Sequence, residues 1–168
     1  QAILRLRSEP ETIHMTFVDK ALKGRLVLYV KGQNQGKLKV RPGGFWKFLV
    51  VNIDPHGERA MKEAVDPVTD QGFPNIARKA EEILARVRES EDSRVSVEWK
   101  ADCGRGVYTR LRIVGRDLGE MTMLVDPTTH FPFQITKKKG GDAAVYTFEN
   151  IQLNPGLKDS EFAVSGKH

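Results

Sequence analysis

Cysteine is scarce in this sequence, and so are the residue patterns that carry chemistry. The 168-residue chain has one cysteine, Cys103, so no disulfide can form within it. Its four histidines, His14, His56, His130 and His168, are widely separated and show none of the paired spacings of metal ligands. We therefore predict no metal and no other cofactor.

The sequence also lacks an arrangement of residues that suits catalysis. Residues 102–106, Asp-Cys-Gly-Arg-Gly, place a thiol beside an arginine, but they are typical of a hairpin turn. Residues 32–37 lack the spacing and the trailing Ser or Thr of a phosphate-binding loop. Residues 54–58 bring acid and base types together, yet Asp-Pro and His-Gly are ordinary turn dipeptides. The prediction is that the protein is not an enzyme.

Long apolar runs are missing as well. None approaches the ~20 residues that a membrane-spanning helix requires, so no transmembrane segment is predicted. The chain begins at Gln1 rather than at methionine. Residues 2–7, which follow at once, already have the pattern of a strand. This start predicts that a leader such as a signal peptide, or a first segment, has been removed. The length predicts one domain over residues 1–168.

Positive charge is in moderate excess. The net charge is +5 and the isoelectric point is about 9.4, with Lys and Arg scattered along the chain. One concentrated run, Lys-Lys-Lys-Gly-Gly-Asp at 137–142, lies between two predicted strands and indicates a solvated hairpin tip. Because no aromatic platform for single strands accompanies the charge, we predict no nucleic-acid partner.

Most of the chain alternates apolar and polar residues with a period of two. This pattern is typical of antiparallel strands with one buried face. The alternating runs are residues 11–18, 25–31, 38–40, 94–100, 107–114, 120–126 and 131–137. A late strand is predicted at 147–153 and ends at Asn-Pro-Gly. Beyond it, Leu157 and Phe162 are expected to anchor the returning chain on the apolar face or rim of the sheet.

One region has helical spacing instead. Apolar residues recur on one face of residues 75–88, and a shorter helix is predicted around 58–65. The predicted fold class is therefore α+β. About nine to ten strands form one strongly curved antiparallel sheet, a half-open β-barrel, because sheets of this size tend to curl. The inserted helix covers the apolar concave face as a lid.

Several segments resemble a known family. Residues 146–162, YTFENIQLNPGLKDSEF, resemble the C-terminal signature of the bacterial outer-membrane lipoprotein-carrier-like (LolA/LolB-like) superfamily. Residues 125–135, VDPTTHFPFQI, resemble a strand–turn–strand of the same superfamily. The segments RSEPETIHMTF, GRLVLYVKGQNQGKLKV and DPVTDQGF are similar to a bacterial domain family of unknown function within it.

The resemblance implies a LolA-like half-barrel in the periplasm or cell envelope. Its ligand would be a lipid or a lipoprotein acyl chain, and its partner a lipoprotein or envelope protein; a monomer is expected. In the carriers an Arg of an Arg-Pro-aromatic strand start holds the lid closed. Position in the strand order favours Arg7 for this role, and the local motif favours Arg41. The residues expected to line the apolar cavity are Met15, Phe17, Leu28, Ile83, Leu84, Trp99, Leu111, Met121, Met123, Phe131 and Phe133.

A packed core is the alternative explanation of the same apolar strand faces. The protein would then be a non-enzymatic scaffold or protein-interaction module whose edge strand recruits a partner. The two hypotheses differ in one property. A carrier needs unfilled apolar volume between the helix at 75–88 and the sheet, whereas an interaction module needs a closed core and an exposed edge.

Overall fold

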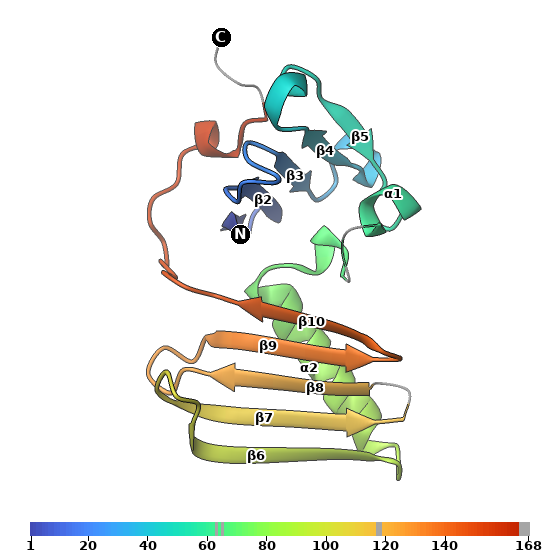
Figure 1. Cartoon of the computed structure of the whole chain (residues 1–168), viewed down its shortest axis with the longest axis vertical. Coiled ribbons are helices and arrows are strands. Elements are labelled where there is room, and N and C mark those ends of the chain that lie inside the picture. Colours follow the sequence, from blue (N-terminus) through green and yellow to red (C-terminus); the bar gives the residue numbers. More distant parts are fainter. Residues whose placement is uncertain (63, 65, 117–118, 165–168) are drawn as a thin grey trace. The chain divides into compact units, whose positions relative to one another are not determined.

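The computed structural model describes residues 1–62, 64, 66–116 and 119–164, and it divides the chain into two compact units. The first unit is Gln1–Ile76 together with the segment that starts at Asn154, and the second is Ala77–Leu153. Each unit contains one five-stranded antiparallel sheet (Figure 1). The boundary between the units falls within helix α2, Phe73–Arg88.

The sheet of the first unit is a simple meander, in which each strand pairs with the next one along the chain. Its strands are β1 Ala2–Arg7, β2 Thr12–Phe17, β3 Leu26–Val30, β4 Leu38–Arg41 and β5 Val51–Ile53. The unit also contains helix α1, Glu58–Met61, and short 3-10 helices at Asn34–Gly36, Gly44–Trp46, Val68–Asp70 and Asp159–Phe162.

The two faces of this sheet differ in composition. Leu4, Met15 and Val27 are paired across β1, β2 and β3, and therefore belong to one apolar face, on which Ile13 is almost fully buried. The opposite face carries charged and polar side chains of β1 and β2 as well as buried leucines of β3. The C-terminal segment covers this second face, where Val164 packs against Leu26 and Leu28.

The start of α2 is tied to the first sheet. Gly72 has φ +98°, and a Cβ there would lie 3.1 Å from the Cδ2 of Leu6, so this close approach suits only glycine. The side-chain amide of Asn75 donates to Glu11 Oε1 at 2.8 Å and to the Gln71 carbonyl at 3.2 Å. The predicted helix is confirmed, although it begins at Phe73, two residues before the predicted start.

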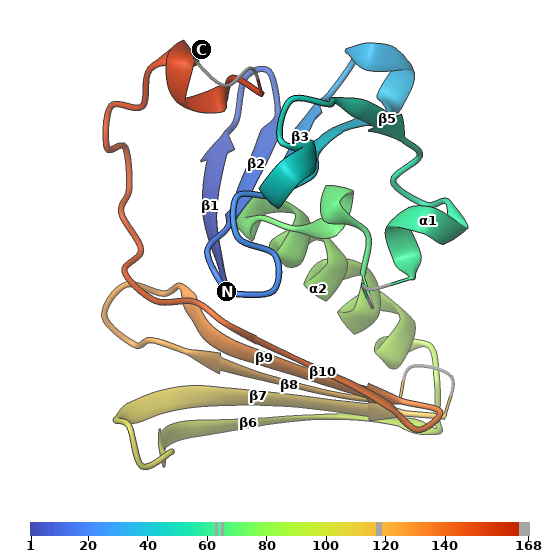
Figure 2. The same cartoon turned by 45° about the horizontal axis from the view of Figure 1, so that its top comes forward.

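The sheet of the second unit is also a meander, with the strand order β10-β9-β8-β7-β6. Its strands are β6 Ser93–Asp102, β7 Val107–Gly115, β8 Gly119–Val125, β9 Pro132–Lys139 and β10 Asp142–Thr147. Helix α2 lies along one face of this sheet in both views (Figure 1 and Figure 2). No helix in the described ranges has both the length and the apolar character required to cross a membrane.

The predicted α+β class and antiparallel pairing are confirmed, but the predicted single curved sheet is not. The ten strands form two five-stranded sheets, and neither sheet is closed into a barrel. The reason lies between β5 and β6. Strand β5 is three residues long and, among the described residues, pairs with β4 alone, and the chain then passes through α1 and α2 before the next described strand begins.

The predicted strand at 147–153 is also wrong. Strand β10 ends at Thr147, and residues 148–158 form no regular element. Asn150 and Asn154 have φ +56° and +50°, a left-handed conformation that a β-strand does not accommodate. The segment therefore leaves the second sheet and returns to the first unit. Of the two predicted anchors, Phe162 is buried and Leu157 is half-buried. The segment covers the second face of the first sheet, beside His14, and not the predicted apolar face.

Candidate functional site

The apolar face of the second sheet is the part of the fold that best suits an apolar ligand. Val97 pairs with Leu111, Leu111 with Met123, and Met123 with Ile135, so an apolar row crosses four strands on one face. The opposite face is mostly polar, although it includes the buried Leu124, and on it Arg110 forms an ion pair with Glu98 at 2.6 Å and Arg112 one with Glu120 at 2.9 Å. This alternation is what the sequence predicts for a sheet with one solvated face.

The apolar face is buried at its centre and exposed at one edge. Ile113, Met123 and Ile135 are buried, whereas Val95 and Val97 on the edge strand β6 are exposed. Trp99, which follows them at the same period, is 76% exposed. On helix α2 the apolar residues Ile83 and Leu84 are only half-buried, and no residue of the helix is fully buried. The helix therefore leaves apolar surface of this unit uncovered.

The bulge in β6 explains why Trp99 lies at the margin. The pairing shifts between Glu98 and Ala101, and Lys100 has φ +61°. Two residues of β6 thus face one residue of β7, which increases the local twist. Trp99 is one of these two residues, so it has no regular partner on β7, and its side chain is exposed.

The remaining predicted cavity residues are distributed over both units. In the second unit Leu111 and Met121 are half-buried on the apolar face, Phe131 is half-buried before β9, and Phe133 stacks on Tyr108 with ring centroids 4.8 Å apart. In the first unit Met15 and Phe17 share the apolar face. The register places Leu28 on the opposite face, directly across from His14. Met15, Phe17 and Leu28 therefore do not line one common face of the first sheet.

Both candidate lid arginines contact the C-terminal segment. Arg7 forms an ion pair with Asp159 at 2.7 Å, and its guanidinium lies 4.3 Å from the centroid of the Phe162 ring. Arg41 donates from Nη1 to the carbonyl of Val164 at 3.2 Å. Arg7 and Arg41, the two alternative candidates for the lid contact, therefore both bind the C-terminal segment, Arg7 near its 3-10 helix and Arg41 at Val164.

His14 is a buried residue whose burial the sequence does not predict. The alternation of β2 assigns it to the polar face, yet its side chain is only 3% exposed because the C-terminal segment covers that face. Neither ring nitrogen has a hydrogen-bond partner in the described part of the chain. Burial, together with the nearby positive charges of Arg5 and Arg41, lowers the pKa of His14 to about 4.

The side chains that could take part in chemistry, among them Cys103 and Asp126, lie in turns. The Cys103 amide donates to the Gly106 carbonyl at 3.1 Å, which closes the β6–β7 hairpin. Asp126 Oδ1 accepts from the amides of Thr129 and Thr128, each at 2.8 Å, and these bonds lower the pKa of Asp126. Within the described ranges, no group of three or more His, Cys, Asp or Glu side chains is placed to hold a metal ion.

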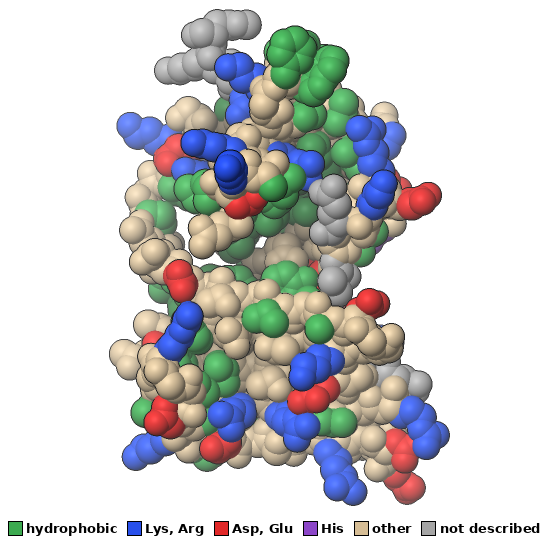
Figure 3. Space-filling model, in the orientation of Figure 1, with side chains coloured by type: hydrophobic (Ala, Val, Ile, Leu, Met, Phe, Trp, Pro, Cys, Tyr) green, Lys and Arg blue, Asp and Glu red, His purple; other side chains and the backbone are tan. Residues whose placement is uncertain are grey.

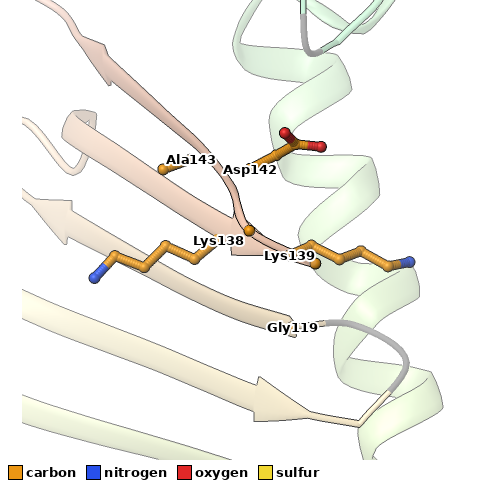
Figure 4. A pocket seen from close by; sticks show the side chains of 7 residues that line it. Gly119, Lys138, Lys139, Asp142 and Ala143 are labelled. Carbon is orange, nitrogen blue, oxygen red and sulfur yellow. The ribbon is translucent and has the colours of Figure 1, made fainter.

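An open depression of about 280 Å³ lies at the tip of the β9–β10 hairpin. Gly119 and residues 138–143 line it, and Figure 4 shows Lys138 and Lys139 projecting to opposite sides of their strand. Neither lysine points into an enclosed space. The predicted solvated hairpin tip is thus confirmed, since the strands flank the Gly140-Gly141 turn.

These features define a small α+β protein built from two antiparallel meanders, one of which keeps an apolar face only partly covered by a helix. The chain belongs to the DUF1571 family of proteins of unknown function, whose family model matches residues 1–168. Comparison with curated proteins and with solved structures finds no match. Membership of the lipoprotein-carrier superfamily stays a prediction.

Proposed function

We propose that this protein binds an apolar ligand, a lipid or lipoprotein acyl chain, on the apolar face of the β6–β10 sheet alongside α2. One observation carries the proposal. Val95 and Val97 extend the apolar face of the sheet onto the edge strand β6, Trp99 follows them in the bulge, and all three side chains are exposed, while α2 buries none of its own residues completely. An acyl chain lying along this row would remove apolar surface from water at about 25 cal/mol per Å².

The proposed role is binding without catalysis. The ligand face is built mainly from aliphatic and sulfur-containing side chains, with Lys137 and Tyr146 near the β10 edge, and the ion pairs Arg110–Glu98 and Arg112–Glu120 lie on the other face. The proposed location is the cell envelope, where acyl chains are abundant. Methionines 121 and 123 suit such a ligand because an unbranched thioether adapts to chains of different shape.

Titration with fatty acids of increasing chain length tests this function through the emission of Trp99. Trp46→Phe removes the second tryptophan, so the signal comes from the proposed ligand face alone. We expect saturable binding whose free energy improves by about 0.8 kcal/mol per added methylene until the apolar row is filled. The fatty acids must be kept below their micellar concentrations. A flat emission response at every chain length, from a folded protein, would sink the proposal.

Two valines on opposite faces provide a matched pair of variants. Val97→Asp places a charge on the apolar row, whereas Val114→Asp places the same charge on the polar face of the neighbouring strand. Both side chains are exposed, so both variants are expected to fold. Fatty-acid affinity should fall about tenfold or more in Val97→Asp, because a buried carboxylate is costly. It should be unchanged in Val114→Asp.

A protein-interaction role is the second candidate, and the edge strand β6 favours it. This strand is ten residues long, ends the strand order of its sheet, and pairs along one side with β7. Long edge strands with exposed apolar residues can accept a strand from a partner. A flat fatty-acid titration, together with protection of the β6 amides in the presence of a strand-forming peptide, would favour this role over the first.

A further inference from the structure

The connection between β4 and β5 forms an exposed aromatic cluster, which we define as Phe45, Trp46 and Phe48. Phe45 is 80% exposed and Phe48 67%, and Trp46 exposes more than half of its surface. The three rings contact one another, with centroids 5.4 Å apart for Phe45 and Trp46 and 6.3 Å for Phe45 and Phe48. They pack mainly on each other and are not buried in the core of the sheet.

The backbone of this connection is well defined. The 3-10 helix Gly44–Trp46 is continued by a hydrogen bond from the Leu49 amide to the Trp46 carbonyl at 3.0 Å. A Cβ at Gly43 would overlap the carbonyl oxygen of Lys23, so the β2–β3 loop packs tightly against the base of the cluster. The aromatic side chains are therefore presented by an ordered turn supported by a second loop.

The chain around the aromatic cluster is rich in positive charge. Residues 20–53 contain eight lysines and arginines and no aspartate or glutamate. Lys47 lies within the cluster segment, and Lys20 and Lys23 belong to the loop that packs against Gly43; all three are exposed. Figure 3 shows hydrophobic side chains protruding at this connection, with Lys and Arg side chains nearby. The aromatic cluster therefore protrudes from the surface and does not line a groove.

We propose that this aromatic cluster docks the protein on a membrane surface that contains anionic lipid. Trp is enriched at the level of the lipid headgroups, and Phe is among the apolar residues that interfacial segments bury at the boundary between headgroups and acyl chains. Lysines around the rings are attracted to anionic headgroups. An exposed aromatic cluster with lysines in its own segment and in the adjoining loop fits the deformable surface of a bilayer, and the eight lysines and arginines of residues 20–53 outnumber the two carboxylates, Asp19 and Asp54, that flank this stretch.

Vesicle binding by the whole chain tests this docking. The probes are phosphatidylcholine vesicles with and without phosphatidylglycerol, and binding is measured by co-sedimentation. The double variant Phe45→Ser and Phe48→Ser is expected to weaken binding to the anionic vesicles roughly 30-fold. Its matched control, Val145→Ser and Leu153→Ser, removes two exposed apolar side chains elsewhere and should leave binding unchanged. Equal binding by the two double variants would overturn the proposal.

Trp46 gives an independent measurement of insertion. In a Trp99→Phe background it is the only tryptophan, so its emission should shift to the blue with anionic vesicles and be quenched by lipids brominated near the headgroup. Replacing Lys20, Lys23 and Lys47 by Gln should reduce binding to anionic vesicles at least tenfold, while binding to phosphatidylcholine changes little. An unshifted Trp46 emission, or a wild-type protein that binds neither vesicle, would rule the docking out. This outcome leaves the fatty-acid titration of the second sheet unaffected.

Discussion

Phe162→Ala is expected to lower the free energy of unfolding of the first unit by about 3–5 kcal/mol, because truncating a buried Phe loses its burial energy and leaves a cavity. Phe162 is 7% exposed, its ring meets that of His14 edge-on at 6.2 Å, and the Arg7 guanidinium lies over it. Loss of the ring also removes the cover from the polar face of β1 and β2, so water gains access to His14.

Urea denaturation followed by circular dichroism measures this effect, and amide exchange in β2 and β3 assigns it to the first unit. Leu153→Ala is the matched control, since this leucine is exposed and lies only nine positions earlier in the chain. It should change the free energy of unfolding by about 0.5 kcal/mol or less. If Phe162→Ala unfolds at the same urea concentration as the wild type, the C-terminal segment does not hold this unit together.

Acidification is expected to destabilise the first unit through His14. Its pKa lies at about 4 in the folded chain and at its ordinary value of 6.5 in the unfolded chain. Between these pH values the unfolded chain binds a proton that the folded chain excludes, so stability is retained above pH 6.5 and is lost as the pH falls toward 4. The full difference corresponds to about 3 kcal/mol of unfolding free energy.

His14→Leu isolates this contribution from that of the carboxylates. Leucine is apolar and of similar size, and it leaves no unpaired ring nitrogen in the buried site. The difference in unfolding free energy between the variant and the wild type should grow by about 3 kcal/mol from pH 7 to pH 4, in favour of the variant. His56→Gln, at an exposed histidine, should follow the wild type. Parallel curves for the wild type and His14→Leu would refute the buried-histidine account.

The strands and the long helix could be predicted because their signals are local. Residues 107–114 alternate, and the structure has β7 at 107–115; residues 75–88 repeat at helical spacing, and α2 covers them. The prediction of a strand at 147–153 was wrong for a local reason, the backbone conformation of two asparagines, which the alternation of apolar residues does not reveal. Asn is tolerated in the left-handed conformation, and two such residues, Asn150 and Asn154, interrupt the extended chain.

The candidate site was predicted only in part. Apolar alternation identified Leu111, Met121 and Met123 as one face of a sheet, and the register confirms that their rows are neighbours. The alternation could not show how much of this face other elements cover. Exposure of Trp99 follows from its position in a bulge of an edge strand, and strand order is not encoded in the alternation itself.

The sequence by itself determined most of the strands and the long helix, the basic character of residues 20–53 and the apolar faces of both sheets, because these depend on residues a few positions apart. Only the tertiary structure decided that ten strands form two sheets, that His14 is buried, and that Arg7 and Arg41 hold one segment. The physical reason is distance along the chain. The hydrogen bond from Arg41 to Val164 joins residues 123 positions apart, and no short-range pattern of side chains records which distant segment will cover a face.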